Sequence, residues 1–235
     1  MKLIEFLKDL LFPKRCPICD DILPFGKYDI CEDCKTKVVY IEEPFCMKCG
    51  KALSHEAEYC NDCVGGRHIY EQGCSVFDYG SIAGSLYRFK NRNRREYAQF
   101  YATQMIKRRG DWIRSIHPDA FIPVPIHKSK KRQRGYNQSK LLADALSEVT
   151  SIPVFDDVII RAKKTTPLKD LSLSERQKYL KKAFKVVRND VKLKTIIIID
   201  DIYTTGSTVD EMAAVLKEQF DCKVYFMTVT IGRGI

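Results

Sequence analysis

The sequence predicts an α/β domain built on a parallel β-sheet, preceded by a small cysteine-rich domain. Three observations support this prediction: an apolar run that ends in two acids, a helical pattern directly after it, and eight cysteines in four pairs. At 235 residues, the chain is long enough for one well-packed domain and a second small one. We place the small domain at residues 1–70 and the α/β domain at residues 71–235.

The N-terminal segment lacks the features of a secretory signal. Its first residues, MKLIEFLKDLLFPKRC, have acids within the apolar stretch and no small-residue cleavage site. No apolar run approaches the roughly 20 residues that are needed to cross a bilayer. Two interpretations of this segment stay open, an amphipathic docking helix and an anchor at a membrane surface. We therefore expect a cytoplasmic protein without a transmembrane segment, either free or peripheral at the inner face of the membrane.

The four cysteine pairs predict two structural zinc sites. Each pair has the spacing CxxC, which places two thiolates on one side of a tight turn, and two turns complete a tetrahedral site. Sequential pairing of the turns is the simplest arrangement, and an interleaved one stays open. Disulfides and iron–sulfur clusters fit four separate pairs less well, and four thiolates leave no position for a catalytic water. The predicted ligands are Cys16, Cys19, Cys31, Cys34, Cys46, Cys49, Cys60 and Cys63.

Two histidines and two cysteines stand outside these pairs. We interpret His55 and His68 as surface or packing residues, with substitution for a zinc ligand as the alternative. Cys74 and Cys222 are interpreted as small buried apolar residues rather than nucleophiles.

A strand that ends in a phosphate-binding loop is predicted near the C-terminus. Ile196 to Ile199 suit a strand buried on both faces, and Val209 to Phe220 carry apolar residues at helical spacing. The small residues between them form a helix N-terminus, where backbone N–H groups and the helix dipole favour an anion. Asp200 and Asp201, just upstream, can accept hydrogen bonds from sugar hydroxyls, so the predicted ligand is a sugar phosphate. The predicted phosphate-binding residues are Thr204, Thr205, Gly206, Ser207 and Thr208.

The segment IIIIDDIYTTGST resembles the 5-phosphoribosyl-1-diphosphate (PRPP) motif of type I phosphoribosyltransferases. The resemblance implies a type I phosphoribosyltransferase-like fold for the parallel-sheet domain, with Mg2+ bound together with PRPP. It also implies that Asp200 and Asp201, as catalytic residues, hold the ribose hydroxyls while the loop holds the 5-phosphate. The alternative is an ordinary strand-to-helix turn, which does not need two adjacent acids and five small or hydroxylated residues together.

Positive charge is concentrated in the predicted α/β domain. Residues 1–75 contain 10 Lys and Arg against 13 Asp and Glu, a net charge of −3, and the remainder contains 30 against 17, or +13. The segment LYRFKNRNRREY interleaves cations with Tyr87, Phe89 and Tyr97, and aromatic side chains can stack bases while cations contact phosphates. An equally good interpretation is a helix with a solvated basic face. The predicted contacts to single-stranded nucleic acid are Arg88, Lys90, Arg92, Arg94 and Arg95.

A further basic segment, residues 127–138, follows a predicted strand at residues 121–125. Basic residues at that place lie at the carboxyl edge of a parallel sheet, where ligands of α/β folds bind. The segment PVPIHKSKKRQRGYNQ is similar to the ComF/GntX family of bacterial competence-related proteins, in which a basic loop follows such a strand. In phosphoribosyltransferases the loop at this place holds the diphosphate. The resemblance therefore implies diphosphate contacts from Lys128, Lys130 and Arg134.

The family pattern also implies a mobile segment at residues 161–184. Leu168 and Tyr179 depart there from the Gln and Asn that the family usually has. These two departures weaken the implication of transferase chemistry and leave the implication of PRPP binding unchanged.

The resemblance covers nearly the whole chain and implies a double zinc ribbon at residues 1–70, followed by a phosphoribosyltransferase-like domain at residues 71–235. It also implies a competence-related DNA-uptake factor that supports natural transformation. Such a protein would bind single-stranded DNA, carry a PRPP site in its α/β domain and work with a helicase-like competence protein. The alternative is an active phosphoribosyltransferase, in the glycosyltransferase class, that transfers phosphoribosyl from PRPP to a nitrogenous base with release of diphosphate. No set of residues after Phe226 indicates a base-binding pocket, which favours the uptake factor.

Overall fold

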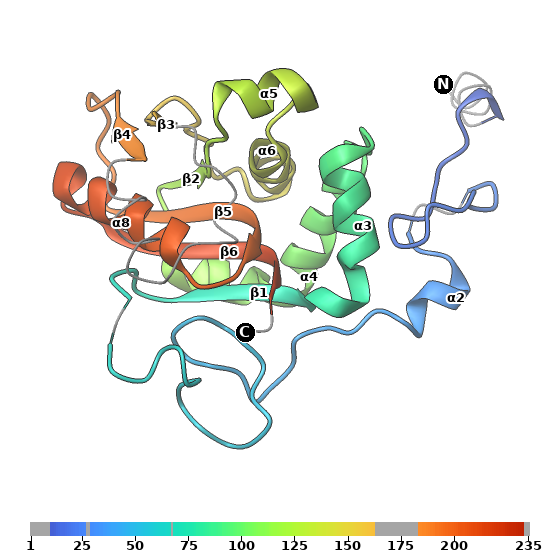
Figure 1. Cartoon of the computed structure of the whole chain (residues 1–235), viewed down its shortest axis with the longest axis horizontal. Helices are drawn as coiled ribbons and strands as arrows, with labels where there is room; N and C mark the ends of the chain where they lie inside the picture. Colours follow the sequence, from blue (N-terminus) through green and yellow to red (C-terminus); the bar gives the residue numbers. More distant parts are fainter. Residues whose placement is uncertain (1–9, 27–28, 67, 163–182, 233–235) are drawn as a thin grey trace.

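A four-stranded, all-parallel β-sheet in the order β1-β6-β5-β2 forms the centre of the fold (Figure 1). The parallel pairing of all four strands confirms the predicted parallel sheet. The computed structural model describes residues 10–26, 29–66, 68–162 and 183–232. Its strands are β1 (Gly73–Asp78), β2 (Ala120–Pro123), β5 (Thr195–Tyr203) and β6 (Lys223–Ile231).

The isoleucine run of β5 is buried on both faces of this sheet. Ile197 and Ile199 belong to one hydrophobic cluster, and Ile196 and Ile198 belong to another. All four side chains have no exposed surface. Successive side chains of a strand point to opposite faces, so the run supplies both clusters at once.

Helices cover the two faces unequally. α3 (Tyr79–Asn91), α4 (Tyr97–Ile116) and α6 (Gln138–Thr150) contribute buried side chains to the cluster that contains Ile197. α8 (Ser207–Phe220) packs in the cluster that contains Ile196. A short antiparallel pair, β3 (Ile159–Arg161) and β4 (Phe184–Val186), joins that second cluster.

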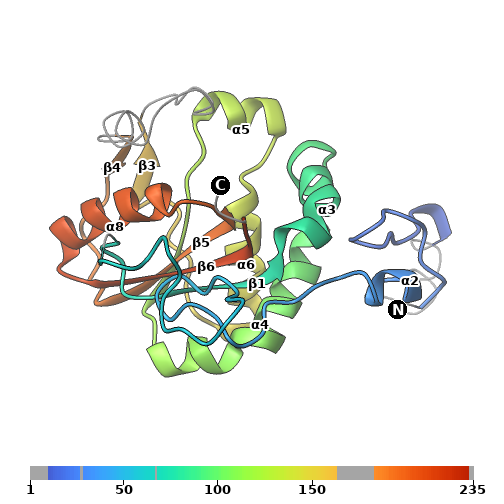
Figure 2. The ribbon, with the colours of Figure 1, turned by 60° about the horizontal axis from the view of Figure 1, so that its bottom comes forward.

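The cysteine-rich region divides between the two clusters. We name residues 10–40 the first cysteine segment, which includes α2 (Glu32–Lys35), and residues 41–72 the second cysteine segment. Cys16 and Leu23 of the first segment pack in the cluster with α3 and α4, whereas Cys46 and Tyr70 of the second pack in the cluster with α8. The hydrophobic clusters therefore extend across the boundary predicted at residue 70. Figures 1 and 2 show the first segment beside α3 and the second beside β1.

The basic stretch after β2 differs from its prediction. We expected a loop there, but residues Lys128–Arg134 form a short helix, α5. Nδ1 of His127 accepts a hydrogen bond from the Ser129 backbone N–H at its start, and Gly135, with φ of 83°, ends it in the left-handed region. Lysine and arginine are good helix formers, and these local caps are sufficient to fix a helix of two turns.

The remaining elements agree with the predictions to within a few residues. The strand expected at residues 121–125 is β2, and the helix expected from Val209 begins two residues earlier. Leu168 and Tyr179 lie outside the described residues, as does most of the predicted mobile segment. No helix within the described residues is long and apolar enough to cross a membrane.

Candidate metal centres and ligand site

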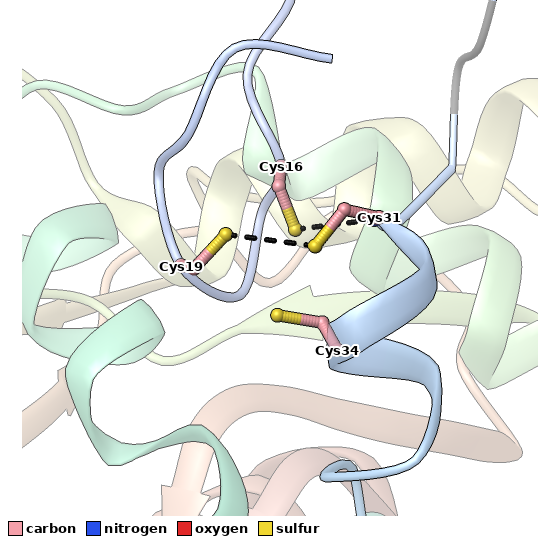
Figure 3. Close-up of side chains that lie close together, drawn as sticks. All are labelled: Cys16, Cys19, Cys31 and Cys34. Carbon is pink, nitrogen blue, oxygen red and sulfur yellow. Dashed lines mark hydrogen bonds between the residues drawn. The ribbon is translucent and has the colours of Figure 1, made fainter. Parts of the chain in front are cut away.

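The eight paired cysteines gather into two clusters of four, and the sequential pairing is the one observed. Figure 3 shows the first cluster, with sulfurs from one turn and from the start of α2 facing one another. Within each cluster all four sulfurs lie within 4.8 Å of one another, and all ten cysteines of the chain are free thiols. The clusters are Cys16, Cys19, Cys31 and Cys34, and Cys46, Cys49, Cys60 and Cys63.

The sulfur spacing fits zinc. Four sulfurs at about 2.3 Å from a tetrahedral Zn2+ lie about 3.8 Å from one another. The Sγ atoms of Cys19 and Cys31 are 3.7 Å apart, and those of Cys49 and Cys60 are also 3.7 Å apart. Both clusters are therefore consistent with structural zinc ions, each held by four thiolates.

Local backbone geometry builds the cysteine turns. Gly50 follows the third CxxC pair with φ of 73°, and its N–H donates to the Cys46 carbonyl at 2.8 Å. A Cβ at Gly50 would lie 2.8 Å from Cα of Cys74 on β1. Glycine is needed here for its conformation and because β1 approaches the turn closely.

The predicted phosphate loop lies between β5 and α8 as expected. Gly206 has φ of 78° and is the N-cap of α8, where its carbonyl accepts from the Asp210 N–H at 2.8 Å. The hydroxyls of Thr205 and Ser207 lie 3.0 Å apart. Thr204 and Thr205 are exposed, and Ser207 and Thr208 are half-buried. The structure thus brings the five predicted loop residues together at the start of a 14-residue helix, where the helix dipole favours an anion.

The two acids before the loop lie in different environments. Oδ1 of Asp200 accepts a hydrogen bond of 2.7 Å from the Ser139 hydroxyl at the start of α6. Burial raises the pKa of Asp200 to about 6, against the opposing effects of Ser139 and nearby cations. Asp201 is almost fully buried, and its Oδ2 lies 2.5 Å from Nζ of Lys90 on α3 as an ion pair. Asp200 is thus half-buried at the carboxyl edge of the sheet, whereas the carboxylate of Asp201 is enclosed and paired with Lys90.

Cations from other elements face Asp200. Arg134 on α5 and Arg161 on β3 both lower its pKa through their charge. Burial and the charges of Arg134 and Arg161 lower the pKa of Lys130. Of the three predicted diphosphate contacts, Arg134 is half-buried and lies near Asp200. Lys130 lies near Arg134 but is exposed, as is Lys128 in the first turn of α5.

The predicted nucleic-acid residues separate into two groups. Arg88 donates to the Ile18 carbonyl, Arg94 pairs with Asp20 at 2.8 Å, and Lys90 pairs with Asp201. Arg92 and Arg95 are exposed, and the Arg95 guanidinium lies 4.8 Å from the centre of the Tyr136 ring. The binding of nucleic acid by these residues stays a prediction, now centred on the two exposed arginines.

The interpretation that Tyr87, Phe89 and Tyr97 stack bases is wrong for two of the three residues. Phe89 and Tyr97 are buried, with exposed fractions of 0% and 1%, so they cannot stack bases from the surface. Each instead packs among α3, α4 and the first cysteine segment. Only Tyr87, at 55%, is exposed among the three aromatic residues named for this role.

A contact network that sequence reasoning missed joins the second cysteine segment to the phosphate loop. Nδ1 of His68 lies 2.6 Å from Oδ2 of Asp210 in the first turn of α8, and the Ile69 N–H donates to Oδ1 of Asp210 at 3.0 Å. Nε2 of His68 lies 3.4 Å from the Tyr203 hydroxyl. A Cβ at Gly206 would lie 2.7 Å from Cε1 of His68. His68 is thus a packing residue of the loop, while His55 is exposed beside Ser54.

A cavity of about 1040 Å³ lies elsewhere, between the first cysteine segment and α4. Leu11, Phe12, Phe100 and Lys107 are among its lining residues. Since neither acid nor any residue of the phosphate loop lines it, this cavity is separate from the Asp200 and Asp201 site.

Comparison with known proteins gives matches over both parts of the chain. Residues 7–64 match a family model described as a double zinc ribbon domain, which confirms that prediction. The chain is 29% identical to competence protein F of Haemophilus influenzae over 218 residues, covering 88% of this chain and 92% of that protein. It is 28% identical to the DNA utilization protein YhgH of Escherichia coli K12 over 213 residues, with the same coverage. It is 29% identical to competence protein ComFC of Bacillus subtilis over 203 residues, covering 81% of this chain and 78% of that protein.

Among solved structures, a purine phosphoribosyltransferase from Pyrococcus horikoshii matches with a TM-score of 0.32 and 16% sequence identity. The match covers 57% of this chain and 87% of that structure.

Proposed function

Because the chain belongs to the family of competence protein F, ComFC and YhgH, we propose that it is a competence-related DNA-uptake factor. In this role it binds single-stranded DNA through its basic face and supports natural transformation. The names of its relatives support a role in competence and DNA utilization. The net charge of +13 after residue 75 supports a nucleic-acid partner, since cations that contact phosphates release counterions on binding.

The ligand proposed for the α/β domain is PRPP or a related ribose phosphate, bound with Mg2+. The observation that carries this proposal is the junction of β5 and α8, where two adjacent acids precede a glycine-containing loop at a helix N-terminus. Phosphate is proposed to bind the backbone N–H groups and hydroxyls of that loop. Asp200 and Asp201 are proposed to accept hydrogen bonds from the ribose hydroxyls, and Lys130 and Arg134 to contact the diphosphate. When bound, Mg2+ would neutralise part of the diphosphate charge.

The two cysteine clusters are proposed to hold zinc with a purely structural role. Each ion would join two turns that have little hydrophobic core of their own. The first cluster would fix the segment that contacts Arg88 of α3 and Arg94 just before α4, and the second would fix the segment that reaches Asp210 through His68. We also propose a cytoplasmic location, free or peripheral at the inner membrane face, and a helicase-like competence protein as a partner.

A second candidate function is an active phosphoribosyltransferase. The observation that favours it is the group of cations around Asp200, which could stabilise a departing diphosphate as negative charge develops on it. Two outcomes of one experiment separate the candidates. Incubation of the protein with PRPP, Mg2+ and a panel of purine and pyrimidine bases should release no diphosphate if the chain is a binding protein. Release that depends on one base would instead establish the transferase.

A further inference from the structure

Lys90, which the sequence predicted as a contact to nucleic acid, lies instead at the Asp200 and Asp201 site. Its Nζ is 2.5 Å from Oδ2 of Asp201, whose side chain is 3% exposed, and the Lys90 side chain is itself only 24% exposed. An ammonium in this position cannot also reach a nucleic acid on the outer surface without breaking a buried ion pair. Breaking such a pair leaves a buried carboxylate without a counter-charge, which is strongly unfavourable.

The orientation of α3 is fixed from both sides. The hydroxyl of Ser85 and the guanidinium of Arg88 donate to backbone carbonyls of the first cysteine segment. The Tyr136 hydroxyl, just after α5, donates to the Phe89 carbonyl. Figure 2 shows α3 and α5 next to each other. These contacts hold the part of α3 that carries Lys90, and the Lys90 ammonium reaches Asp201 on β5.

Lys90 lies close enough to Lys130 and Arg134 of α5 for their charges to affect its pKa. Burial lowers the pKa of Lys90 to about 8; Asp200 opposes this shift, while the charges of Arg134 and Lys130 add to it. Lysine and arginine side chains that repel one another across a site favour an anion between them. Lys90 pairs with Asp201, Lys90 and Arg134 both interact with Asp200 through their charges, and Lys130 lies near Lys90 and Arg134. The phosphate loop at Thr204 to Thr208 is a separate group of donors.

We infer that Lys90 is a ligand-binding residue of the Asp200 and Asp201 site, supplied by α3, and that it contacts the 1-diphosphate of PRPP together with Lys130 and Arg134. This inference rests on the proposed PRPP function. It distinguishes two parts of one ligand: the loop after β5 binds the 5-phosphate, and Lys90 binds the opposite, diphosphate end. It also removes Lys90 from the residues that bind single-stranded DNA.

The test compares two ligands on the full chain with both zinc ions bound. Titration calorimetry in Mg2+ measures the dissociation constants of PRPP and ribose 5-phosphate for wild type, Lys90→Met and the control Arg92→Met. A hydrogen bond to a charged group contributes about 1.5–3 kcal/mol, so Lys90→Met should weaken PRPP binding about 10- to 100-fold. Ribose 5-phosphate, which has no diphosphate, should lose less affinity than PRPP, because both ligands lose the counter-charge of Asp201 and only PRPP also loses a contact to its diphosphate. Arg92→Met should bind both ligands as wild type does.

Failure of the inference is distinguishable from failure of the proposed function. If wild type binds PRPP and Lys90→Met binds it equally well, the inference is wrong and the PRPP site stands. An equal loss of affinity for both ligands would also overturn it, because that result means Lys90 acts only by orienting Asp201. If wild type binds neither ligand, the proposed PRPP function fails and the inference fails with it.

A second variant covers the case in which Lys90→Met does not fold, as judged by its melting temperature and zinc content. Lys90→Arg keeps a positive charge that does not titrate in the accessible range. PRPP affinity of wild type should fall as pH rises above about 8, because the Lys90 ammonium loses its proton there among Asp200, Asp201, Lys130 and Arg134. The affinity of Lys90→Arg should stay constant over the same range. Parallel pH profiles for the two proteins would contradict the inference.

Discussion

The hydroxyls of Tyr70 and Tyr203 share a hydrogen bond of 2.7 Å between the second cysteine segment and the last residue of β5. Burial raises the pKa of both phenols, so both are neutral. Tyr203 also stacks on Phe226 of β6, with ring centroids 4.6 Å apart. The second cysteine cluster is therefore connected to the phosphate loop by a direct chain of side chains, whereas the first is connected to α3.

This difference predicts unequal effects of the two clusters on ligand binding. Wild type should carry two zinc ions per chain, and Cys31→Ser and Cys60→Ser should each lose one. Cys60→Ser should weaken binding of ribose 5-phosphate by about tenfold or more, because His68 and Tyr70 no longer hold the loop. Cys31→Ser should weaken it less. Metal analysis by mass spectrometry and calorimetry check both statements, and a zinc content near zero in wild type would refute the zinc assignment.

Gly206 allows a matched comparison of crowding and backbone strain. Gly206 and Gly26 both have φ of 78°, but a Cβ at Gly206 would lie 2.5 Å from the Tyr203 hydroxyl, while a Cβ at Gly26 would meet nothing within 4 Å. Gly26→Ala should reduce the free energy of unfolding by about 1 kcal/mol, the usual magnitude for a left-handed residue that is not glycine. Gly206→Ala should reduce it by about 2 kcal/mol or more, since the clash adds to the same strain. Urea denaturation measures both, and equal losses would show that His68 and Tyr203 do not crowd the loop.

Ligand binding should weaken in acid because of Asp200. Its pKa is raised to about 6 in the folded protein, so it is ionised at pH 7.5 and becomes protonated as the pH falls through about 6. The protonated carboxyl is a poorer acceptor for ribose hydroxyls, and the affinity for ribose 5-phosphate should decline below that pH. The phosphate of the ligand titrates in the same range. Asp200→Asn, which cannot titrate, is the control. The affinity of wild type for ribose 5-phosphate should fall more steeply with decreasing pH than that of Asp200→Asn. Identical pH profiles would show that Asp200 does not bind the ribose hydroxyls.

Arg92 and Arg95 should carry a measurable part of the affinity for single-stranded DNA. Each phosphate contact contributes about −0.7 to the slope of log affinity against log salt for single strands. The double change of Arg92 and Arg95 to Ala should therefore reduce the steepness of this slope by about 1 to 1.4. Arg94 is left unchanged because it pairs with Asp20, and Arg114→Ala, an exposed arginine at the end of α4, is the control. Fluorescence anisotropy with a labelled oligonucleotide measures the slope, and an unchanged slope in the double variant would place the DNA elsewhere.

Local patterns predicted the elements that depend on neighbouring residues. The isoleucine run predicted β5 because a strand buried on both faces needs apolar residues at successive positions. The CxxC spacing predicted the two cysteine clusters because zinc geometry requires it. By contrast, His68 and Asp210 are 142 positions apart in the sequence, and Lys90 and Asp201 are 111 apart. Such contacts follow from the packing of whole elements and leave no periodic signal.

The basic segment at residues 86–97 is a second case in which long-range contacts could not be predicted from the sequence. Its alternation of cations and aromatics is compatible with a nucleic-acid surface and with an ordinary helix, and the residues alone cannot separate them. The structure assigns the aromatics Phe89 and Tyr97 to the interior. It pairs Arg88 with Ile18, 70 positions upstream, and Arg94 with Asp20, 74 positions upstream, both in the first cysteine segment. The helix α5 was missed for a different reason, since a run of like charges suggests a loop while local capping fixes a helix.

The central claim is a PRPP site at the end of β5, and calorimetric titration of PRPP in Mg2+ tests it most directly. Wild type should bind with a stoichiometry of one per chain. Asp201→Ala should bind at least about tenfold more weakly, the result of losing hydrogen bonds between a carboxylate and sugar hydroxyls. Gly206→Val, which places a branched side chain against Tyr203 and His68 at the loop, should abolish binding. Equal affinity in wild type and both variants, or no binding by the zinc-loaded wild type, would contradict the claim.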